Sequence, residues 1–181
     1  LKNFSNYVFV IQARLGSLRL PGKILLSLGK STVLGTLVEN ILAFGIPEKR
    51  IVIATSNNPL DDLTWEYSQQ LGVTVVRGSE TDVLSRYQAA ARLFDCDHIV
   101  RLTADNPFPD GRLIEHSIRR HESDKPALTS TRLIHPDGRV ERYVPKGLSI
   151  DIMRKDALLS IDEAACSPFE KEHVIPYFFL K

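Results

Sequence analysis

The sequence contains only two cysteines, Cys96 and Cys166, among its 181 residues. Neither has a partner histidine or cysteine at the spacing of a zinc site, and two cysteines cannot form the disulfide framework of a small secreted domain. The N-terminal residues also lack the charged segment and apolar segment of a secretory signal. These absences predict a reducing, cytoplasmic environment.

No apolar run approaches the roughly 20 residues that a membrane-spanning helix requires. The longest candidate, Tyr7–Ile11, has the length of a strand. Lysine and arginine together number 23 against 22 aspartates and glutamates, so the net charge is only +1. Without a basic surplus or interleaved aromatic residues, neither a nucleic acid nor a membrane is an expected partner.

Two common nucleotide-binding motifs are missing as well. There is no G-x-G-x-x-G dinucleotide fingerprint. A P-loop has four residues between its glycines and a Ser or Thr after its lysine, whereas here five residues separate Gly16 from Gly22, and Ile24 follows Lys23. No convincing Ser-His-Asp or Cys-His set is present either, so a protein nucleophile is not favoured.

The composition is that of an ordinary globular protein, with 43% hydrophobic and 25% charged residues. The length is sufficient to bury a core and is typical of one domain. Internal repeats, low-complexity tracts and linkers are absent. Residues 1–181 are therefore expected to form a single domain.

Short apolar runs alternate with amphipathic helical patterns over the first 118 residues or so. The runs have the length of strands covered on both faces, and they are Tyr7–Ile11, Ile51–Thr55, Val73–Arg77 and His98–Leu102. Helices are predicted over about 33–42, after Asn58, over 82–94 with Thr81 as cap, and over 112–121 with Asp110 as cap. This alternation predicts an α/β fold with a doubly wound, mostly parallel, Rossmann-like sheet and helices on both faces.

The pattern is less regular after residue 123. Strands are predicted at Ala127–Thr131 and Gly147–Met153, with a turn at Pro136-Asp137-Gly138 between them. Ser167-Pro168-Phe169-Glu170 has the form of a capping box, which predicts a final helix over Pro168–Phe179.

The most informative segment runs from Gln12 to Lys23, directly after the first predicted strand. It contains two glycines, two arginines and a lysine. Ligands of open α/β sheets bind at the carboxyl ends of the strands, where glycine backbone groups and cationic side chains hold anions. On composition alone, a basic surface loop with ordinary turn glycines would explain the segment equally well.

A second candidate segment, Arg101–Pro107, follows the fourth predicted strand. Asp105 lies where a carboxylate could hold Mg²⁺ against phosphates bound by the first loop. The alternative is that Asp105 only caps a turn before Pro107.

Taken together, these segments resemble the cytidylyltransferase-like nucleotidyltransferases, especially the SpsF type of spore-coat polysaccharide biosynthesis, which is similar to the CMP-sialic acid and CMP-Kdo synthetases. The resemblance covers nearly the whole chain, in order. It is carried by Gln12-Ala13-Arg14-x-Gly16-Ser17-x-Arg19-Leu20-Pro21-Gly22-Lys23, Ala54-Thr55-Ser56, Arg77-Gly78-Ser79-Glu80-x-Asp82-Val83-Leu84-x-Arg86-Tyr87, Arg101–Pro107, Pro145-x-Gly147-Leu148 and Glu172-His173-Val174-x-Pro176-Tyr177.

The resemblance implies a nucleotide-diphospho-sugar transferase fold and a role for each matching residue. Arg14 and Lys23 would neutralise a triphosphate, and Asp105 would be the metal ligand; these three form the implied catalytic set. The other residues implied to bind the nucleotide are Gln12, Ala13, Gly16, Ser17, Arg19, Asp82 and Arg86. Ala13 and Gly16 would act through their backbone amides.

The acceptor side is implied to involve Asp151, Glu172 and His173. For Glu172 and His173, the polar face of a terminal helix is an equally good explanation. Family members usually carry an acidic residue soon after Gly-Leu, but here Ser149 follows Leu148, and Asp151 lies two residues further on the same strand face. The family also continues beyond its Glu-His-Val-x-Pro helix to a second metal carboxylate, which this chain lacks, so activity of the 181 residues is in question.

The function implied is transfer of a nucleotide, with CTP favoured, to a sugar acid or sugar phosphate, with Mg²⁺ as cofactor and pyrophosphate as product. This is a step of surface polysaccharide biosynthesis. One alternative is a non-catalytic nucleotide-binding domain of a larger protein. Another is a glycosyltransferase, although its metal motif could only be Asp95-Cys96-Asp97, which precedes a strand. A homodimer is a further expectation, with residues 125–150 as the contact region.

Overall fold

The computed structural model describes residues 4–17 and 19–180, so Leu18 of the predicted loop lies outside the described residues. Its main sheet has six strands in the order β5-β4-β1-β6-β10-β7. The bounds of these strands are β1 (Tyr7–Gln12), β4 (Ile51–Ser56), β5 (Thr74–Gly78), β6 (His98–Thr103), β7 (Leu128–Ser130) and β10 (Asp151–Arg154).

The first four strands of the chain to enter this sheet are parallel. β1 pairs with β4 on one side and β6 on the other, and β4 pairs with β5. The strand β10 is antiparallel to both β6 and β7. The predicted α/β class with a mostly parallel sheet is therefore confirmed, and β1 occupies a central position.

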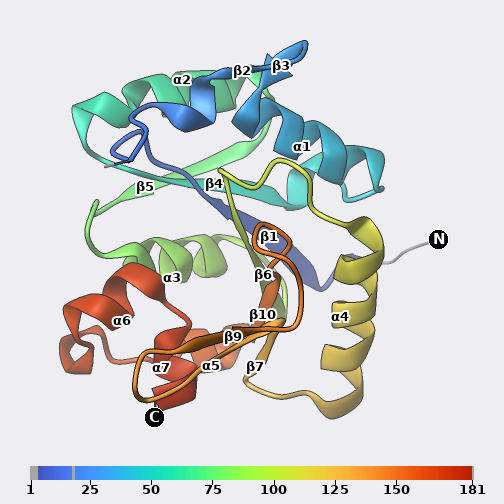
Figure 1. Ribbon diagram of the computed structural model, residues 1–181, viewed down its shortest axis with the longest axis vertical. Coiled ribbons are helices and arrows are strands. Elements are labelled where there is room, and N and C mark those ends of the chain that lie inside the picture. Colours follow the sequence, from blue (N-terminus) through green and yellow to red (C-terminus); the bar gives the residue numbers. More distant parts are fainter. Residues whose placement is uncertain (1–3, 18, 181) are drawn as a thin grey trace.

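Helices cover both faces of the sheet (Figure 1). The helices α1 (Val33–Ala43), α2 (Asp62–Gln70) and α4 (Gly111–Asp124) pack on one face, and α3 (Val83–Leu93), α5 (Lys155–Leu159), α6 (Pro168–His173) and α7 (Pro176–Leu180) pack on the other. Within the described part of the chain, no helix is long and apolar enough to cross a membrane. The remaining elements are η1 (Lys23–Leu25), η2 (Glu48–Arg50), η3 (Pro59–Asp61), η4 (Glu163–Ala165), and the pairs β2 (Ser27–Leu28) with β3 (Ser31–Thr32) and β8 (Arg132–Ile134) with β9 (Val140–Arg142).

The alternation of side chains along β1 explains its continuous apolar sequence. Phe9 and Ile11 belong to the core beneath α1 and α4, whereas Val8 and Val10 belong to the core beneath α3. Successive strand residues point to opposite faces, and both faces are covered here, so every one of these positions is apolar.

The predicted helix starts are confirmed at Asn58, at Asp110 and at the Ser167 capping box of α6, and wrong at one position. Asn58 accepts a hydrogen bond from the Leu60 amide and begins η3, which leads into α2. Asp110 caps α4. Asp82, and not Thr81, caps α3, because its carboxylate accepts the Ser85 amide proton at 2.9 Å.

The C-terminal elements are shorter than predicted. The strand predicted at 147–153 contains only β10, since Gly147 has a φ of 101° and the preceding residues form a turn closed by the Leu148 amide and the Pro145 carbonyl. The helix predicted over 168–179 is divided into α6 and α7. Val174 has a φ of 65°, and Pro176 disfavours the helical conformation of the residue before it.

The half-buried His98 and the buried His121 form a pair at the amino end of β6. His98 stacks on Tyr7 with ring centroids 4.9 Å apart, and its Nδ1 lies 3.1 Å from Nε2 of His121 on α4. Thr129 lies within hydrogen-bonding distance of the other His121 nitrogen. Burial, the neighbouring His98 and the charge of Arg154 lower the pKa of His121 to about 4.

This pair makes the folded state sensitive to acid. The folded-state pKa of His121 is below the value of 6.5 for an unperturbed histidine, so the unfolded chain binds more protons between these two values. The His121 contribution to stability is therefore present above pH 6.5 and is lost as the pH falls toward 4. We expect a loss of about 2 kcal/mol in the free energy of unfolding between pH 7 and pH 5 from this group, measured by chemical denaturation.

The matched control is on the same helix. His121→Gln should flatten this pH dependence, whereas substitution of the exposed His116 by Gln should leave it unchanged. An equally steep pH dependence in His121→Gln would refute the assignment.

Candidate functional site

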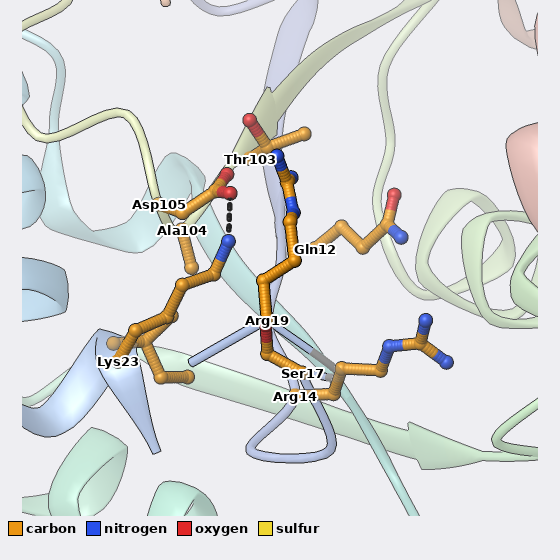
Figure 2. A pocket seen from close by; sticks show the side chains of 9 residues that line it. Gln12, Arg14, Ser17, Arg19, Lys23, Thr103, Ala104 and Asp105 are labelled. Atoms are coloured by element: carbon orange, nitrogen blue, oxygen red, sulfur yellow. Dashed lines mark hydrogen bonds and ion pairs between the residues drawn. The ribbon is translucent and has the colours of Figure 1, made fainter. Parts of the chain in front are cut away.

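A cavity of about 400 Å³ opens at the carboxyl ends of β1 and β6 (Figure 2). Its lining consists of residues from the loop after β1 and from the segment that ends β6: Gln12, Arg14, Ser17, Arg19, Lys23, Ile24, Thr103, Ala104 and Asp105. Six of these residues were predicted from sequence as site residues. The parallel register aligns Gln12 with Thr103, which brings the two sequence segments to one edge of the sheet.

The loop between β1 and η1, residues 13–22, is held by hydrogen bonds to buried groups. The Ala13 amide donates to the Ala54 carbonyl of β4 at 3.1 Å, and the Leu15 amide donates to the buried Asp61 carboxylate at 2.7 Å. Gly22, with a φ of 69°, donates to the Leu15 carbonyl and begins η1. These contacts direct Lys23, the first residue of η1, into the cavity.

Lys23 and Asp105 form an ion pair across the cavity (Figure 2). Burial would raise the pKa of the Asp105 carboxyl, but the hydrogen bond and the charge of Lys23 outweigh this effect and hold the pKa below its usual value. Asp105 is therefore ionised at neutral pH and available to a cation.

Positive charge predominates in the cavity. Arg14, Arg19 and Lys23 contribute three cationic groups against the one carboxylate of Asp105. The Arg14 guanidinium also contacts Glu172 of α6 at 3.3 Å, but both side chains are more than 30% exposed, so this ion pair is weak. A phosphorylated ligand would supply the missing negative charge.

A family model described as "Cytidylyltransferase" matches residues 8–181. The chain belongs to the cytidylyltransferase family. Among curated proteins it is similar to the spore coat polysaccharide biosynthesis protein SpsF of Bacillus subtilis, with 38% identity over 157 residues. The match covers 85% of this chain and 65% of the Bacillus protein, so the chain spans less than two thirds of that relative. The family resemblance seen in the sequence motifs is confirmed.

Two solved structures have the same fold. A cytidylyltransferase from Leptospira borgpetersenii has a TM-score of 0.83 and 33% identity, over 97% of this chain and 71% of the other. CMP-2-keto-3-deoxy-manno-octonic acid synthetase, solved in complex with CTP, has a TM-score of 0.68 over 97% of this chain and 85% of the other. At 19% identity, the second comparison supports the fold alone.

Two loop residues, Ala13 and Gly16, were predicted to bind the nucleotide through their backbone amides. Both lie against neighbouring groups of the protein. The Ala13 amide is already bonded to Ala54, so it is not available to a nucleotide in this conformation. Gly16 lies against Glu80, and a Cβ at this position would come within 3.0 Å of the Glu80 carboxylate. The loop therefore packs closely against the Glu80 side chain, in the segment before α3.

Asp82 and Arg86 do not line the cavity. The Asp82 carboxylate caps α3. The Arg86 side chain is 1% exposed and donates to the Ala54 carbonyl at 3.3 Å, while its Nε and Nη2 have no hydrogen-bond partner among the described residues. Burial lowers the pKa of Arg86, and the charge of Arg14 lowers it further. Arg86 therefore contributes a buried positive charge near the loop, and it does not contact the cavity directly.

Asp151, which was predicted to contact the acceptor, is not among the residues that line the cavity. Its side chain is 1% exposed, and its carboxylate accepts hydrogen bonds from Ser130, Arg101 and Arg132. These three donors occupy both oxygens. Asp151 is therefore the buried counter-ion of two arginines, Arg101 and Arg132.

Glu172 and His173 lie on α6, outside the residues that line the cavity. Glu172 reaches the cavity through Arg14, and the His173 ring packs edge-on against Phe169. Partial burial lowers the pKa of His173; Glu172 opposes this change, while Arg101, Arg132 and Arg14 add to it. The imidazole is consequently neutral at pH 7.

The loop anchor Asp61 was not identified as a site residue from sequence. Its Oδ1 accepts the Leu15 amide proton and its Oδ2 accepts the Ser56 hydroxyl proton. Thr103 and Ala104 were also missed, although they belong to the same motif as Asp105. The available signal for Asp61 was its position in the segment that follows the carboxyl end of β4, at the edge of the sheet where the loop lies.

Asp61→Ala should destabilise the protein, because it leaves the buried Ser56 hydroxyl and the Leu15 amide without their acceptor. We expect the free energy of unfolding to fall by about 2–4 kcal/mol in urea denaturation. Asp62→Ala is the matched control, since Asp62 is exposed and forms only a surface ion pair with Arg77. Equal stability of the two variants would contradict the anchoring role.

Proposed function

We propose that this chain transfers a nucleotide from CTP to a sugar acid or sugar phosphate, with release of pyrophosphate, as a step in surface polysaccharide biosynthesis. The observation that carries the proposal is the convergence of Arg14, Arg19, Lys23 and Asp105 in one cavity at the carboxyl ends of β1 and β6. The family supports nucleotidyl transfer. The Bacillus relative, a spore coat polysaccharide biosynthesis protein, supports the polysaccharide context, and the family supports CTP as the donor. A sugar-acid acceptor is supported by the 3-deoxy-manno-octulosonate cytidylyltransferase of Colwellia psychrerythraea, which is 25% identical over 176 residues.

The reaction proposed forms one bond and breaks one bond at the α-phosphorus. An acceptor oxygen attacks this phosphorus, the bond to the bridging oxygen of the β-phosphate breaks, and pyrophosphate leaves with that electron pair. Negative charge increases on the phosphate oxygens during this displacement. Arg14, Arg19 and Lys23 are positioned to stabilise that charge, and no protein nucleophile is needed.

The carboxylate at Asp105 fits a magnesium ion that is held mainly by substrate phosphates and water. Mg²⁺ commonly uses one or two protein carboxylates in such sites. In the described ranges, no cluster of three or more His, Cys, Asp or Glu residues converges as a cation site. Asp105 would thus be the protein ligand, and the metal would supply charge neutralisation for the triphosphate.

The acceptor is proposed to bind beside α6. Glu172 contacts Arg14, and the adjacent His173 is neutral at pH 7, so its ring can accept or donate a hydrogen bond to a sugar hydroxyl. Both residues are accessible to solvent, which suits a replaceable substrate.

The first test is titration calorimetry of the chain with CTP, ATP, GTP and UTP, with and without Mg²⁺, followed by pyrophosphate release with candidate sugar acids. We expect Mg²⁺-dependent preference for CTP, and an affinity at least tenfold lower in Arg14→Ala and Asp105→Ala. Unchanged affinity in both variants would exclude this cavity. Binding without turnover would instead support a non-catalytic nucleotide-binding domain.

The Lys23–Asp105 ion pair generates a separate prediction. The Lys23 ammonium occupies the carboxylate that a divalent cation would use, so it competes with that cation when no nucleotide is present. Lys23→Met should therefore raise the affinity of the nucleotide-free chain for Mn²⁺ severalfold, measured by electron paramagnetic resonance, while lowering its affinity for CTP.

The control for this prediction is Lys30→Met, which removes an exposed lysine outside the cavity. It should change neither affinity. If Lys23→Met binds Mn²⁺ no better than the unmodified chain, Lys23 does not compete for Asp105.

A further inference from the structure

A continuous set of hydrogen bonds connects the cavity to the interior of the sheet. Arg101 of β6 donates through Nη2 to Gln12 Oε1 and through Nη1 to Asp151 Oδ2, both at 3.1 Å. Asp151 also accepts from Ser130 at 2.7 Å and from Arg132 at 2.6 Å. Gln12 is the only one of these five residues that lines the cavity.

Strand register explains how the set is assembled. Arg101 pairs with Val10 of β1 and with Asp151 of β10, and Gln12 is two residues beyond Val10 on the same face of β1. Diagonal neighbours on adjacent strands are within reach of a long side chain. The planar guanidinium can therefore contact Gln12 on one side and Asp151 on the other.

Burial makes this arrangement rigid. Arg101 is 8% exposed and Asp151 is 1% exposed. An unpaired charge at this depth is strongly unfavourable, so neither partner can turn away without losing a compensating contact. Arg101 is thus held by a counter-ion that takes no part in the cavity.

The chemistry of the guanidinium determines how the Gln12 amide is oriented. Arginine has five N–H donors and no acceptor, so the Gln12 atom that faces Arg101 must be the oxygen. The Gln12 Nε2, with its two N–H donors, is the part of the amide left for a ligand.

We infer that Arg101 is a positioning residue that makes Gln12 a donor-only contact, selecting a substrate atom that accepts a hydrogen bond. The inference rests on the proposed function for the existence of that substrate. Figure 2 shows the Gln12 side chain directed away from the Lys23–Asp105 pair, and Arg14 extends to the same side of the view. The contact is therefore separate from the Lys23–Asp105 pair, where the metal is proposed to bind.

Two substrates could supply the accepting atom. A nucleotide base offers carbonyl oxygens and ring nitrogens, and an acceptor sugar offers hydroxyl or carboxylate oxygens. Titration with CTP and Mg²⁺ tests the nucleotide base as the source, and measurement of KM for the acceptor tests the acceptor sugar.

The test is a double-mutant cycle between Gln12→Met and Arg101→Lys. Gln12→Met removes the amide at similar volume and should weaken binding of one of the two substrates by about tenfold, with kcat nearly unchanged. Arg101→Lys keeps the charge beside Asp151 but lacks the fork that contacts both partners, so it should weaken the same substrate by a similar factor. In the Gln12→Met background, Arg101→Lys should cause no further loss.

If Arg101 had a purely structural role, Arg101→Lys would cause the same loss of substrate affinity in the unmodified protein and in the Gln12→Met variant. This result would overturn the inference. Unchanged binding of both substrates in Gln12→Met would also overturn it. The matched control is Ser130→Ala, which removes a contact to Asp151 without touching Gln12. It should lower stability but not substrate affinity.

A measurement without substrate keeps this inference separate from the proposed function. In ¹⁵N relaxation of the free chain, the Gln12 side-chain amide should be as ordered as the backbone, and it should become mobile in Arg101→Lys. The exposed Gln69 of α2 provides a mobile reference within the same sample. A Gln12 amide as mobile as that of Gln69 would overturn the positioning role even if the chain bound no nucleotide at all.

Discussion

The parallel pairing of β1 with β6 is the constraint on which the cavity depends. Because parallel strands end at the same edge of a sheet, the loop after Gln12 and the segment after Thr103 meet although about 90 residues separate them in the chain. The pairing of β1 with β4 brings the Ala54 carbonyl to the Ala13 amide, and the segment after β4 carries Asp61, which accepts the Leu15 amide proton. These two hydrogen bonds hold the base of the loop. Shifting either strand by one residue would reverse its faces and separate these groups.

Electrostatic balance is the second organising feature. The buried Arg101 is paired with Asp151 in the interior, whereas the cavity retains more positive than negative charge. This difference is consistent with a ligand that brings its own negative charge. The Lys23–Asp105 pair lies between these two situations, because it is an ion pair within the cavity. Each group is the other's partner in the free chain. Since both side chains are partly exposed, replacing this ion pair by contacts to a ligand costs little free energy.

Most of the fold and about half of the proposed site could be predicted from sequence. Continuous apolar runs identify strands covered on both faces, and residues such as Asn58 and Asp110 mark helix starts by local hydrogen bonding. The motif at residues 12–23 predicted five residues that line the cavity, and the segment after β6 predicted a sixth, Asp105. The predictions that were wrong depended on particular local geometry: Asp82 rather than Thr81 satisfies the first amides of α3, and the left-handed conformation of Val174 divides the final helix.

By itself, the sequence determined the α/β class, the family and the residues of the loop, because these depend on periodicity, capping and contiguous motifs. The tertiary structure alone decided the roles of polar residues distant in sequence. Asp151 and Asp105 are both aspartates at the sheet edge. Asp151 is saturated by three donors from other strands, and Asp105 is open to the cavity. Burial and hydrogen-bond partners come from residues far away in the chain, and no local pattern encodes them.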